Sequence, residues 1–154
     1  MKEDNEMGLQ VAGEMPVGRV KPCRVIDFEQ HHDPRGSLTV VDSEGATGFS
    51  IQRVYYLHDI TPRAVRGGHA HRETEQLIIA VAGNFEATVT DGLHHATYRL
   101  DQPGQGLYVG PMVWVGLESF SPGAVGLILA SSHYDEADYC RDYNEFLHVA
   151  GSLP

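Results

Sequence analysis

Short apolar segments alternate with glycine- and proline-containing turns along most of the 154-residue chain. Segments that are rich in β-branched and aromatic residues and end at such turns predict β-strands. We expect strands at 23–28, 37–41, 49–57, 76–82, 84–90, 95–100, 107–109, 112–115 and 124–130. Another strand should follow from 64–68 and carry two histidines, His69 and His71. The apolar run within 76–82 predicts a strand that is buried on both faces.

Turn signals and one helical pattern complete this outline. Asp33-Pro34-Arg35-Gly36 predicts a tight turn, and Asp91-Gly92 predicts a two-residue hairpin loop. Helical spacing is confined to the end of the chain, where aromatic residues recur at three- to four-residue intervals from Asp135 on. Short strands at regular spacing, separated by such turns, predict an all-β sandwich or barrel with a short C-terminal helix.

The domain organisation follows from where this pattern begins. Residues 1–20 are polar and interrupted by glycine and proline, so we expect an N-terminal arm that is flexible or pairs with another subunit. Residues 21–150 are long enough for one domain with its own core. The chain has neither a fixed-period repeat nor a low-complexity segment, and nothing in it supports a second domain.

Composition narrows the classes of function. The formal net charge of −10 argues against a broad nucleic-acid interface, although one local basic pocket remains possible. The two cysteines, Cys23 and Cys140, make neither a disulfide framework nor a zinc motif, which favours a reducing compartment. No apolar run has the length of a membrane span, and the N-terminus lacks the apolar core of a secretory signal. We therefore expect a cytoplasmic protein without a membrane partner.

The two closely spaced histidines are the first candidates for chemistry. In a strand, side chains alternate between faces, so His69 and His71 would point the same way, roughly 6–7 Å apart along the strand. Two imidazoles at this spacing can reach neighbouring atoms of one small substrate, or one metal ion. Histidine titrates near neutrality, so one ring can take a proton while the other gives one. The residues alone support a catalytic role and a purely structural role equally. In the structural role, both rings hydrogen-bond inside the fold.

A metal site is the second interpretation of the segment that contains His69 and His71. His69-Ala70-His71 followed by Glu75 resembles the first motif of the cupins, and Glu75 could complete a two-histidine, one-carboxylate set. Metal-binding cupins also supply a histidine from a later strand. The corresponding region, 106–116, contains none, and Trp114 stands about where that histidine is expected. The set is incomplete, so no metal is expected.

A series of segments along the chain carries a more specific resemblance. These segments are Asp33-Pro34-Arg35-Gly36, Arg53-Val54-Tyr55-Tyr56, Val65-Arg66-Gly67-Gly68-His69-Ala70-His71, Gln76, Gly106-Leu107-Tyr108-Val109, Trp114, Phe120-Ser121, Leu129-Ala130-Ser131, Tyr134-Asp135-Glu136-Ala137-Asp138-Tyr139 and Arg141-Asp142-Tyr143. In this order they resemble the sugar 3,4-ketoisomerase family of cupins, often labelled WxcM-like, over residues 33–146. His-Ala-His alone is a weak signal, whereas its order with the Arg-Val-Tyr-Tyr and Tyr-Asp-Glu segments is a strong one.

The resemblance implies a fold, a reaction and a set of partners. The fold is a cupin-type jelly roll, and residues 21–150 would form a single WxcM-like domain. The reaction is the isomerisation of a dTDP-linked 4-keto-6-deoxyhexose, in which the carbonyl moves from C4 to C3 through an enediol or enediolate. The resemblance also implies a homodimer that uses neither a metal nor another cofactor.

The resemblance assigns roles to individual residues as well. His69, His71 and Tyr55 match the family's active-site histidines and tyrosine. We expect His69 to carry the proton between C3 and C4, His71 to move protons between the two oxygens, and Tyr55 to donate a hydrogen bond or relay a proton. Gln76 and Trp114 belong to matching segments and are expected to contact the substrate.

Three arginines are candidates for holding the diphosphate. Guanidinium groups bind phosphate oxygens in pairs, which makes Arg35, Arg53 and Arg66 suitable. Salt bridges at the surface or the barrel end are an equally good use for them, and the residues do not choose among the three.

Two departures from the family pattern concern specificity. Members commonly have a charged Trp-Arg-Glu segment where this chain has Trp114-Val115-Gly116, and larger residues can precede the first histidine where this chain has Gly67-Gly68. Both changes bear on sugar specificity and on the C4 configuration of the product more than on the reaction type. The alternatives that stay open are a metal-dependent cupin enzyme, a sugar epimerase and a non-catalytic module that binds nucleotide sugars.

Overall fold

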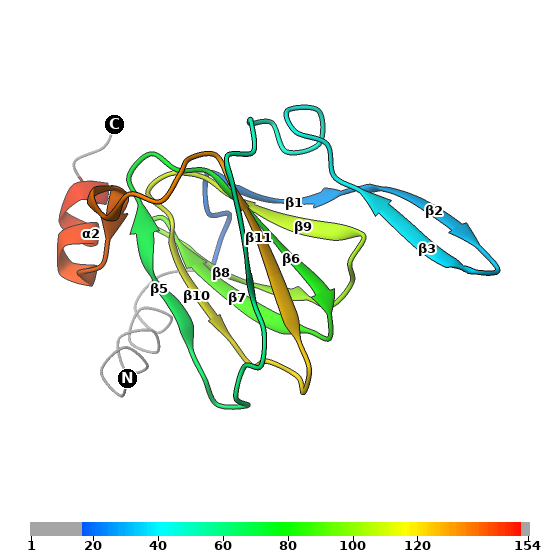
Figure 1. Ribbon diagram of the computed structural model, residues 1–154. Helices are drawn as coiled ribbons and strands as arrows, with labels where there is room; N and C mark the ends of the chain where they lie inside the picture. Colours follow the sequence, from blue (N-terminus) through cyan, green and yellow to red (C-terminus); the bar gives the residue numbers. More distant parts are fainter. Residues whose placement is uncertain (1–16, 152–154) are drawn as a thin grey trace.

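Two five-stranded antiparallel sheets face each other and form the body of the protein in the computed structural model, which describes residues 17–151 (Figure 1). The first sheet has the order β1 (Cys23–Asp27), β9 (Gln105–Val109), β6 (Gln76–Ala82), β11 (Val125–Ala130) and β4 (Arg53–Leu57). The second has the order β12 (Tyr139–Cys140), β5 (Arg66–His71), β10 (Trp114–Glu118), β7 (Phe85–Thr90) and β8 (His95–Leu100). The predicted all-β sandwich with a short C-terminal helix is confirmed.

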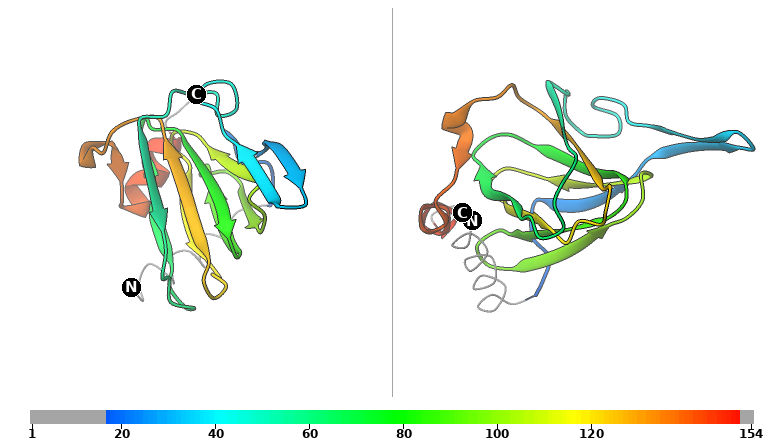
Figure 2. Two further views of the ribbon diagram at one scale, coloured as in Figure 1. Left: turned by 45° about the vertical axis from the view of Figure 1, so that its right-hand side comes forward. Right: turned by 60° about the horizontal axis from the view of Figure 1, so that its bottom comes forward.

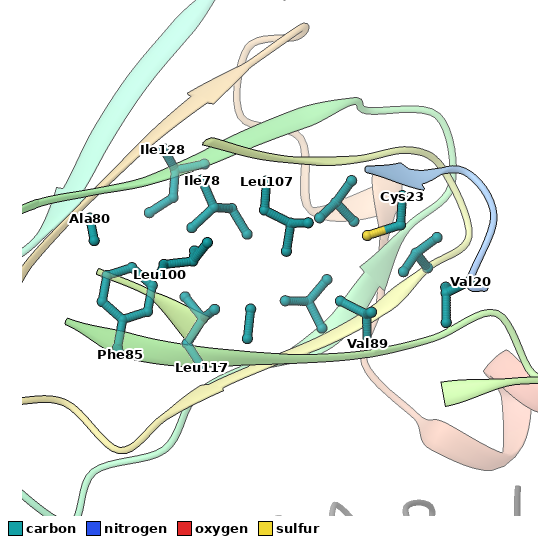
Figure 3. Close-up of a cluster of buried hydrophobic side chains, with 14 of the residues drawn as sticks. Val20, Cys23, Ile78, Ala80, Phe85, Val89, Leu100, Leu107, Leu117 and Ile128 are labelled. Atoms are coloured by element: carbon teal, nitrogen blue, oxygen red, sulfur yellow. The ribbon is translucent and has the colours of Figure 1, made fainter. Parts of the chain in front are cut away.

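The main core lies between the two sheets, as Figure 3 shows. Ile78, Leu107 and Ile128 point inward from the first sheet and meet Val89 and Leu117 from the second. Each of these side chains is buried, and burial of apolar surface is the dominant favourable term in folding. β6 is buried on both faces from Gln76 to Ala80, because residues 41–51 cover its outer face. The prediction for 76–82 is wrong at the end of the strand, where Val81 and Ala82 are exposed.

A two-stranded hairpin leaves the body on the side opposite the C-terminal helix (Figures 1 and 2). It consists of β2 (Glu29–Asp33) and β3 (Gly36–Val40), joined by the turn that Asp33-Pro34-Arg35-Gly36 predicted. Every residue of β2 is exposed. At the tip, the Arg35 guanidinium donates to the Asp33 carboxylate at 2.7 Å.

The C-terminal segment departs from the helix expected from Asp135 on. Helix α2 spans only Tyr143–Gly151. The residues before it form a short 3-10 helix, η1 (Glu136–Asp138), and the strand β12, which pairs with the end of β5. The strand ladder and the hydrogen bonds of Asp138 hold this stretch against β5, and those contacts outweigh the local helical spacing.

Smaller differences concern the ends of elements. β4 begins at Arg53 instead of residue 49, β10 runs over Trp114–Glu118 instead of 112–115, and the Asp91-Gly92 turn is part of a four-residue loop. In that loop the Asp91 carboxylate accepts hydrogen bonds from two backbone amides, which stabilises the longer turn.

Part of the predicted N-terminal arm lies outside the described residues, which begin at Val17. From there to residue 20 the chain lies against the second sheet. Val17 forms a parallel bridge with His95, and Val20 is fully buried in the main core.

Candidate active site

His69 and His71 lie on the inner face of β5, as the two-residue period predicted. Their ring centroids are 5.1 Å apart and the rings are nearly perpendicular. The backbone before them is unusual, because Gly67 and Gly68 have φ angles of +80° and +77°. A Cβ on Gly67 would lie 2.7 Å from the carbonyl oxygen of Val115. Glycine is therefore required where the ladder between β5 and β10 shifts register, and this shift directs His69 into the fold.

A cavity of about 110 Å³ opens between β4 and β5. Its lining is contributed by β4, β5, β6, β10 and β11, and comprises Tyr55, Leu57, Arg66, Gly67, His69, Gln76, Ile78, Val115, Leu117 and Ile128. A space of this size holds several water molecules, so it exceeds an ordinary packing defect. The structure thus brings His69, Tyr55, Gln76 and Arg66 to one cavity, although they come from three different strands.

Tyr55 and Gln76 form a polar pair on the cavity wall. Nε2 of Gln76 donates to the hydroxyl oxygen of Tyr55 at 2.6 Å. Burial, and to a lesser extent Tyr139, raise the pKa of the Tyr55 phenol to about 12, although Arg53 and Gln76 offset part of this rise. The phenol is therefore protonated near neutral pH. Because its oxygen already accepts from Gln76, its own proton is available to donate to a ligand in the cavity.

His71 lies behind His69 and is held by a carboxylate from the C-terminal segment. Its side chain is 4% exposed, and Nδ1 lies 2.9 Å from Oδ2 of Asp138. Burial alone would raise the pKa of Asp138, but hydrogen bonds from Thr74, His71 and the Glu73 amide outweigh it and lower that pKa. An ionised Asp138 accepts a hydrogen bond from Nδ1–H and leaves Nε2 of His71 as the basic nitrogen.

Both imidazoles are neutral near pH 7. Burial lowers the pKa of His69 to about 4, and the neighbouring His71 and Arg141 contribute to this lowering. Burial also lowers the pKa of His71, and Asp138 opposes this effect without cancelling it. Nδ1 of His69 and Nε2 of His71 are buried and have no hydrogen-bond partner in the described part of the chain. Each neutral imidazole keeps one unprotonated nitrogen, which can act as a base that removes a proton from carbon.

Tyr139 also contacts the histidines. Its ring lies 4.9 Å from that of His69 and 4.4 Å from that of His71, between centroids. The guanidinium carbon of Arg141 lies 4.3 Å from the centroid of the Tyr139 ring. The sequence analysis assigned no function to Asp138 or Tyr139. Both lie in the Tyr-Asp-Glu segment that resembles the family, and this position was the sequence feature that could have identified them as site residues.

The predicted arginines occupy three different places. Arg66 lines the cavity and its side chain reaches solvent. Arg53 lies beside the site, with its guanidinium carbon 5.3 Å from the Tyr55 ring centroid and Nη1 3.4 Å from the Tyr139 hydroxyl. Arg35 is not brought to the cavity of its own chain, because it lies at the tip of the projecting hairpin and pairs with Asp33.

Trp114 is likewise not brought to the cavity. Alternation along β10 turns Val115 toward His69 and Trp114 toward the opposite face. The indole packs against helix α2, 5.0 Å from the Tyr143 ring and 5.5 Å from the Phe146 ring, between centroids.

Glu75 does not join the two histidines. Its carboxylate accepts a hydrogen bond from the Tyr108 hydroxyl at 2.5 Å, on the first sheet. Within residues 17–151, no group of three or more His, Cys, Asp or Glu side chains is arranged to hold a metal ion. In the same range, no helix is long and apolar enough to cross a membrane.

Comparisons with known proteins give one consistent family. Residues 21–151 match the family model described as "FdtA: WxcM-like, C-terminal". The chain is also 42% identical over 123 residues to TDP-4-oxo-6-deoxy-alpha-D-glucose-3,4-oxoisomerase from Aneurinibacillus thermoaerophilus, an alignment that covers 80% of this chain and 88% of that protein.

Solved structures of related proteins have the same fold. A 3,4-ketoisomerase from Helicobacter canadensis is 36% identical, with a TM-score of 0.83 over 87% of this chain and 100% of that one. QdtA, a sugar 3,4-ketoisomerase from Thermoanaerobacterium thermosaccharolyticum in complex with TDP, is 32% identical, with a TM-score of 0.85 over 86% of this chain and 97% of that one. A histidine-to-asparagine mutant of QdtA is known in complex with TDP-4-keto-6-deoxyglucose.

Proposed function

The chain belongs to the FdtA family of WxcM-like proteins, and on this basis we propose that it is a 3,4-ketoisomerase that converts a TDP-linked 4-keto-6-deoxyhexose into its 3-keto isomer. The observation that carries the proposal is a pair of neutral imidazoles, His69 and His71, beside a cavity that also holds a protonated phenol, Tyr55. A relative of 42% identity and structural neighbours with the same activity support it.

The reaction needs one base for carbon and a proton route between two oxygens. A base removes the proton on C3, and the electron pair of the C3–H bond forms a C3=C4 double bond while the C4 carbonyl oxygen becomes an enediolate oxygen. That oxygen takes up a proton, and the hydroxyl on C3 loses its own. The C3 carbonyl then forms as the proton returns to C4. Nothing is oxidised or reduced overall, so the residues need supply only proton transfer and stabilisation of the oxyanion.

His69 is the base for carbon in this proposal. It lines the cavity, whereas His71 lies behind it, and the lowered pKa of His69 keeps its imidazole unprotonated at neutral pH. Because C3 and C4 are adjacent, one imidazole can remove the proton from one carbon and return it to the other. A positioned general base contributes roughly 10²–10⁴-fold in rate.

His71 and Tyr55 serve the oxygens. Asp138 holds Nδ1 of His71, which leaves Nε2 as its basic nitrogen. We assign it the transfer of protons between the two oxygens, which requires the substrate to reach Nε2 past His69, because that atom is buried. Tyr55 donates its phenol proton to the enediolate oxygen, because Gln76 already occupies the phenol oxygen as a donor. Such preorganised donors stabilise charge that develops during the reaction.

The diphosphate would lie at the open rim of the cavity. Arg66 lines the cavity and is exposed, and Arg53 lies between the Tyr55 and Tyr134 rings, so both are placed to meet a phosphate near the sugar. The described residues give Arg53 no carboxylate partner, which leaves its charge available for an anion.

We also propose a homodimer and a cytoplasmic location, which surface features and cysteine chemistry support. The exposed apolar side chains Leu38, Val54 and Tyr56 on the hairpin and on the edge strand β4 support a homodimer, because an isolated two-stranded hairpin is only marginally stable in water. Light scattering at micromolar protein tests the dimer. Two buried free thiols, Cys23 and Cys140, fit a reducing compartment such as the cytoplasm, and residues 21–150 would form one domain.

Proton NMR of a reaction started from TDP-4-keto-6-deoxyglucose in deuterium oxide tests the activity. We expect loss of the C4 ketone, appearance of the C3 ketone, and partial deuterium at C4. His69→Asn should lower the rate by roughly 10²–10⁴-fold. A near-wild-type rate in that variant contradicts the role of His69.

The other readings give different results in the same experiment. Inversion at C3 or C5 without movement of the carbonyl would identify an epimerase, and tight binding without turnover would identify a binding module. Stoichiometric iron, manganese or zinc in active protein, together with loss of turnover on chelation, would identify a metal-dependent enzyme.

A further inference from the structure

The cavity beside His69 has one polar wall and one apolar wall. His69, Tyr55 and Gln76 supply the polar side. The strand registers place apolar residues directly beside them, with Val115 opposite His69 on β10 and Ile128 opposite Tyr55 on β11. Directly opposed side chains in antiparallel strands are close neighbours, about 4.5–5.5 Å apart at Cβ. Whatever lies against His69 and Tyr55 therefore also touches an apolar surface.

The apolar wall offers no hydrogen-bonding side chain to a ligand. Leu57, Ile78, Val115, Leu117 and Ile128 make up this wall. Among the polar side chains that line the cavity, His69, Tyr55 and Gln76 form the opposite, polar wall and Arg66 reaches solvent at the rim. A hydroxyl placed against this wall would lose its hydrogen bonds with water and gain none from these side chains, which is unfavourable.

The substrate class of the proposed function has one alkyl group that fits this wall. In a 4-keto-6-deoxyhexose, C2, C3 and C4 carry oxygen, C1 carries the nucleotide, and C5 carries the C6 methyl group. C6 is only two bonds from C4. If C3 and C4 lie against His69 and Tyr55, the methyl group is the substituent nearest the reacting carbons that needs no hydrogen-bond partner.

We propose, resting on the proposed function, that Val115 and its apolar neighbours Leu117 and Ile128 form the subsite for the C6 methyl group and make the enzyme selective for 6-deoxy sugars over 6-hydroxy sugars. Val115 is the principal residue because it lies opposite His69 and is buried.

The expected preference is moderate. An apolar pocket rejects a ligand that adds one hydroxyl by roughly 10- to 100-fold, because part of the cost is relieved by small shifts of the pocket. The preference should therefore be measurable as a ratio of dissociation constants and need not be absolute.

The test compares TDP-6-deoxyglucose with TDP-glucose by isothermal titration calorimetry. Both ligands have a hydroxyl at C4 and lack the ketone, so neither is isomerised, and they differ only at C6. Wild-type protein should bind the 6-deoxy ligand at least about 10-fold more tightly. Val115→Thr, a nearly isosteric change that adds a hydroxyl to the wall, should reduce the ratio to less than about 3-fold.

Val89→Thr is the matched control. Val89 is buried and pairs with Val115 across β7 and β10, but it does not line the cavity. This variant makes the same chemical change in the same layer of the core and should keep the wild-type ratio. Leu117→Asn repeats the test at a second wall position should Val115→Thr fail to fold.

The outcomes separate the subsite from the proposed function. Equal affinities in wild-type protein, an equal change of the ratio in Val115→Thr and Val89→Thr, or binding of neither ligand overturns the subsite. Turnover of TDP-4-keto-6-deoxyglucose by the same preparations is measured in parallel. Normal turnover together with equal affinities removes only the methyl subsite, whereas absence of turnover contradicts the proposed function.

Discussion

Nδ1 of His71 and Oδ2 of Asp138 are 2.9 Å apart, although the two residues are separated by 67 positions in the chain. The side chains are only 4% and 11% exposed. The carboxylate is fixed from two further sides, by the Thr74 hydroxyl at Oδ2 and by the Glu73 amide at Oδ1. Asp138 therefore cannot rotate away from His71, and it determines which imidazole nitrogen carries the proton.

Replacing Asp138 with asparagine should impair catalysis more than folding. The amide can present its NH₂ group to Nδ1, which would favour the tautomer with the proton on Nε2 and leave His71 unable to accept a proton from the substrate. We expect kcat to fall by at least about 10²-fold, with a smaller change in KM. Steady-state kinetics and thermal unfolding of the same samples measure both effects.

Asp142→Asn is the control for this prediction. Asp142 lies in the same segment, and its carboxylate accepts from the Glu145 amide at the start of α2. Asparagine caps a helix about as well as aspartate, so kcat should stay near the wild-type value. Equal loss of activity in the two variants would mean that Asp138 has only a structural role.

The direction of the hydrogen bond between Gln76 and Tyr55 gives a second prediction. Gln76→Glu replaces the donor with a carboxylate, which would accept the phenol proton of Tyr55 and withdraw it from the substrate. We expect kcat to fall about as far as it does in Tyr55→Phe, by roughly 10²–10³-fold. If Gln76→Glu is fully active while Tyr55→Phe is not, the phenol does not act as a donor to the oxyanion.

The rate of the wild-type enzyme should depend little on pH near neutrality. The pKa of His69 is about 4 and that of His71 is also lowered, so both bases stay unprotonated until the pH approaches acidic values. The pKa of Tyr55 is about 12, so the acid stays protonated on the alkaline side. kcat/KM should be flat from about pH 6 to 9 and fall below about pH 5, where the imidazoles take up protons. A half-loss of kcat/KM near pH 6.5 would contradict a desolvated His69.

The two glycines before His69 should differ in their tolerance of a side chain. Gly68 has a φ of +77° but open space around its Cα, so Gly68→Ala should cost only the backbone strain, about 1 kcal/mol. Gly67→Ala meets the same strain and also places a Cβ 2.7 Å from the Val115 carbonyl oxygen. We expect Gly67→Ala to lower the free energy of unfolding by at least about 2 kcal/mol, measured by urea denaturation. A smaller cost at Gly67 than at Gly68 would show that the β5–β10 ladder adjusts easily.

Some features of the site could be predicted from the sequence because they depend on local geometry. The two-residue period of a strand places His69 and His71 on one face whatever surrounds them, and their ring centroids are indeed 5.1 Å apart. The turn at residues 33–36 and most strands were predictable for the same reason, because proline fixes φ, glycine permits positive φ, and aspartate hydrogen-bonds the nearby backbone.

Long-range register decided the rest. Gln76 donates to Tyr55 only because β11 holds β6 and β4 on its two sides, and Asp138 accepts from His71 only because β12 pairs the C-terminal segment with β5. No local pattern encodes either arrangement. The face of β10 is a similar case, since a one-residue difference in register turns Val115 to the cavity and Trp114 to helix α2.

The sequence by itself thus determined the strand period, the turns and the paired histidines, because each depends on neighbours within a few residues. The tertiary structure alone decided which carboxylate orients His71, which donor supports Tyr55 and which apolar residues border His69. These relationships join residues from separate strands, and they exist only once the two sheets have packed and fixed their registers.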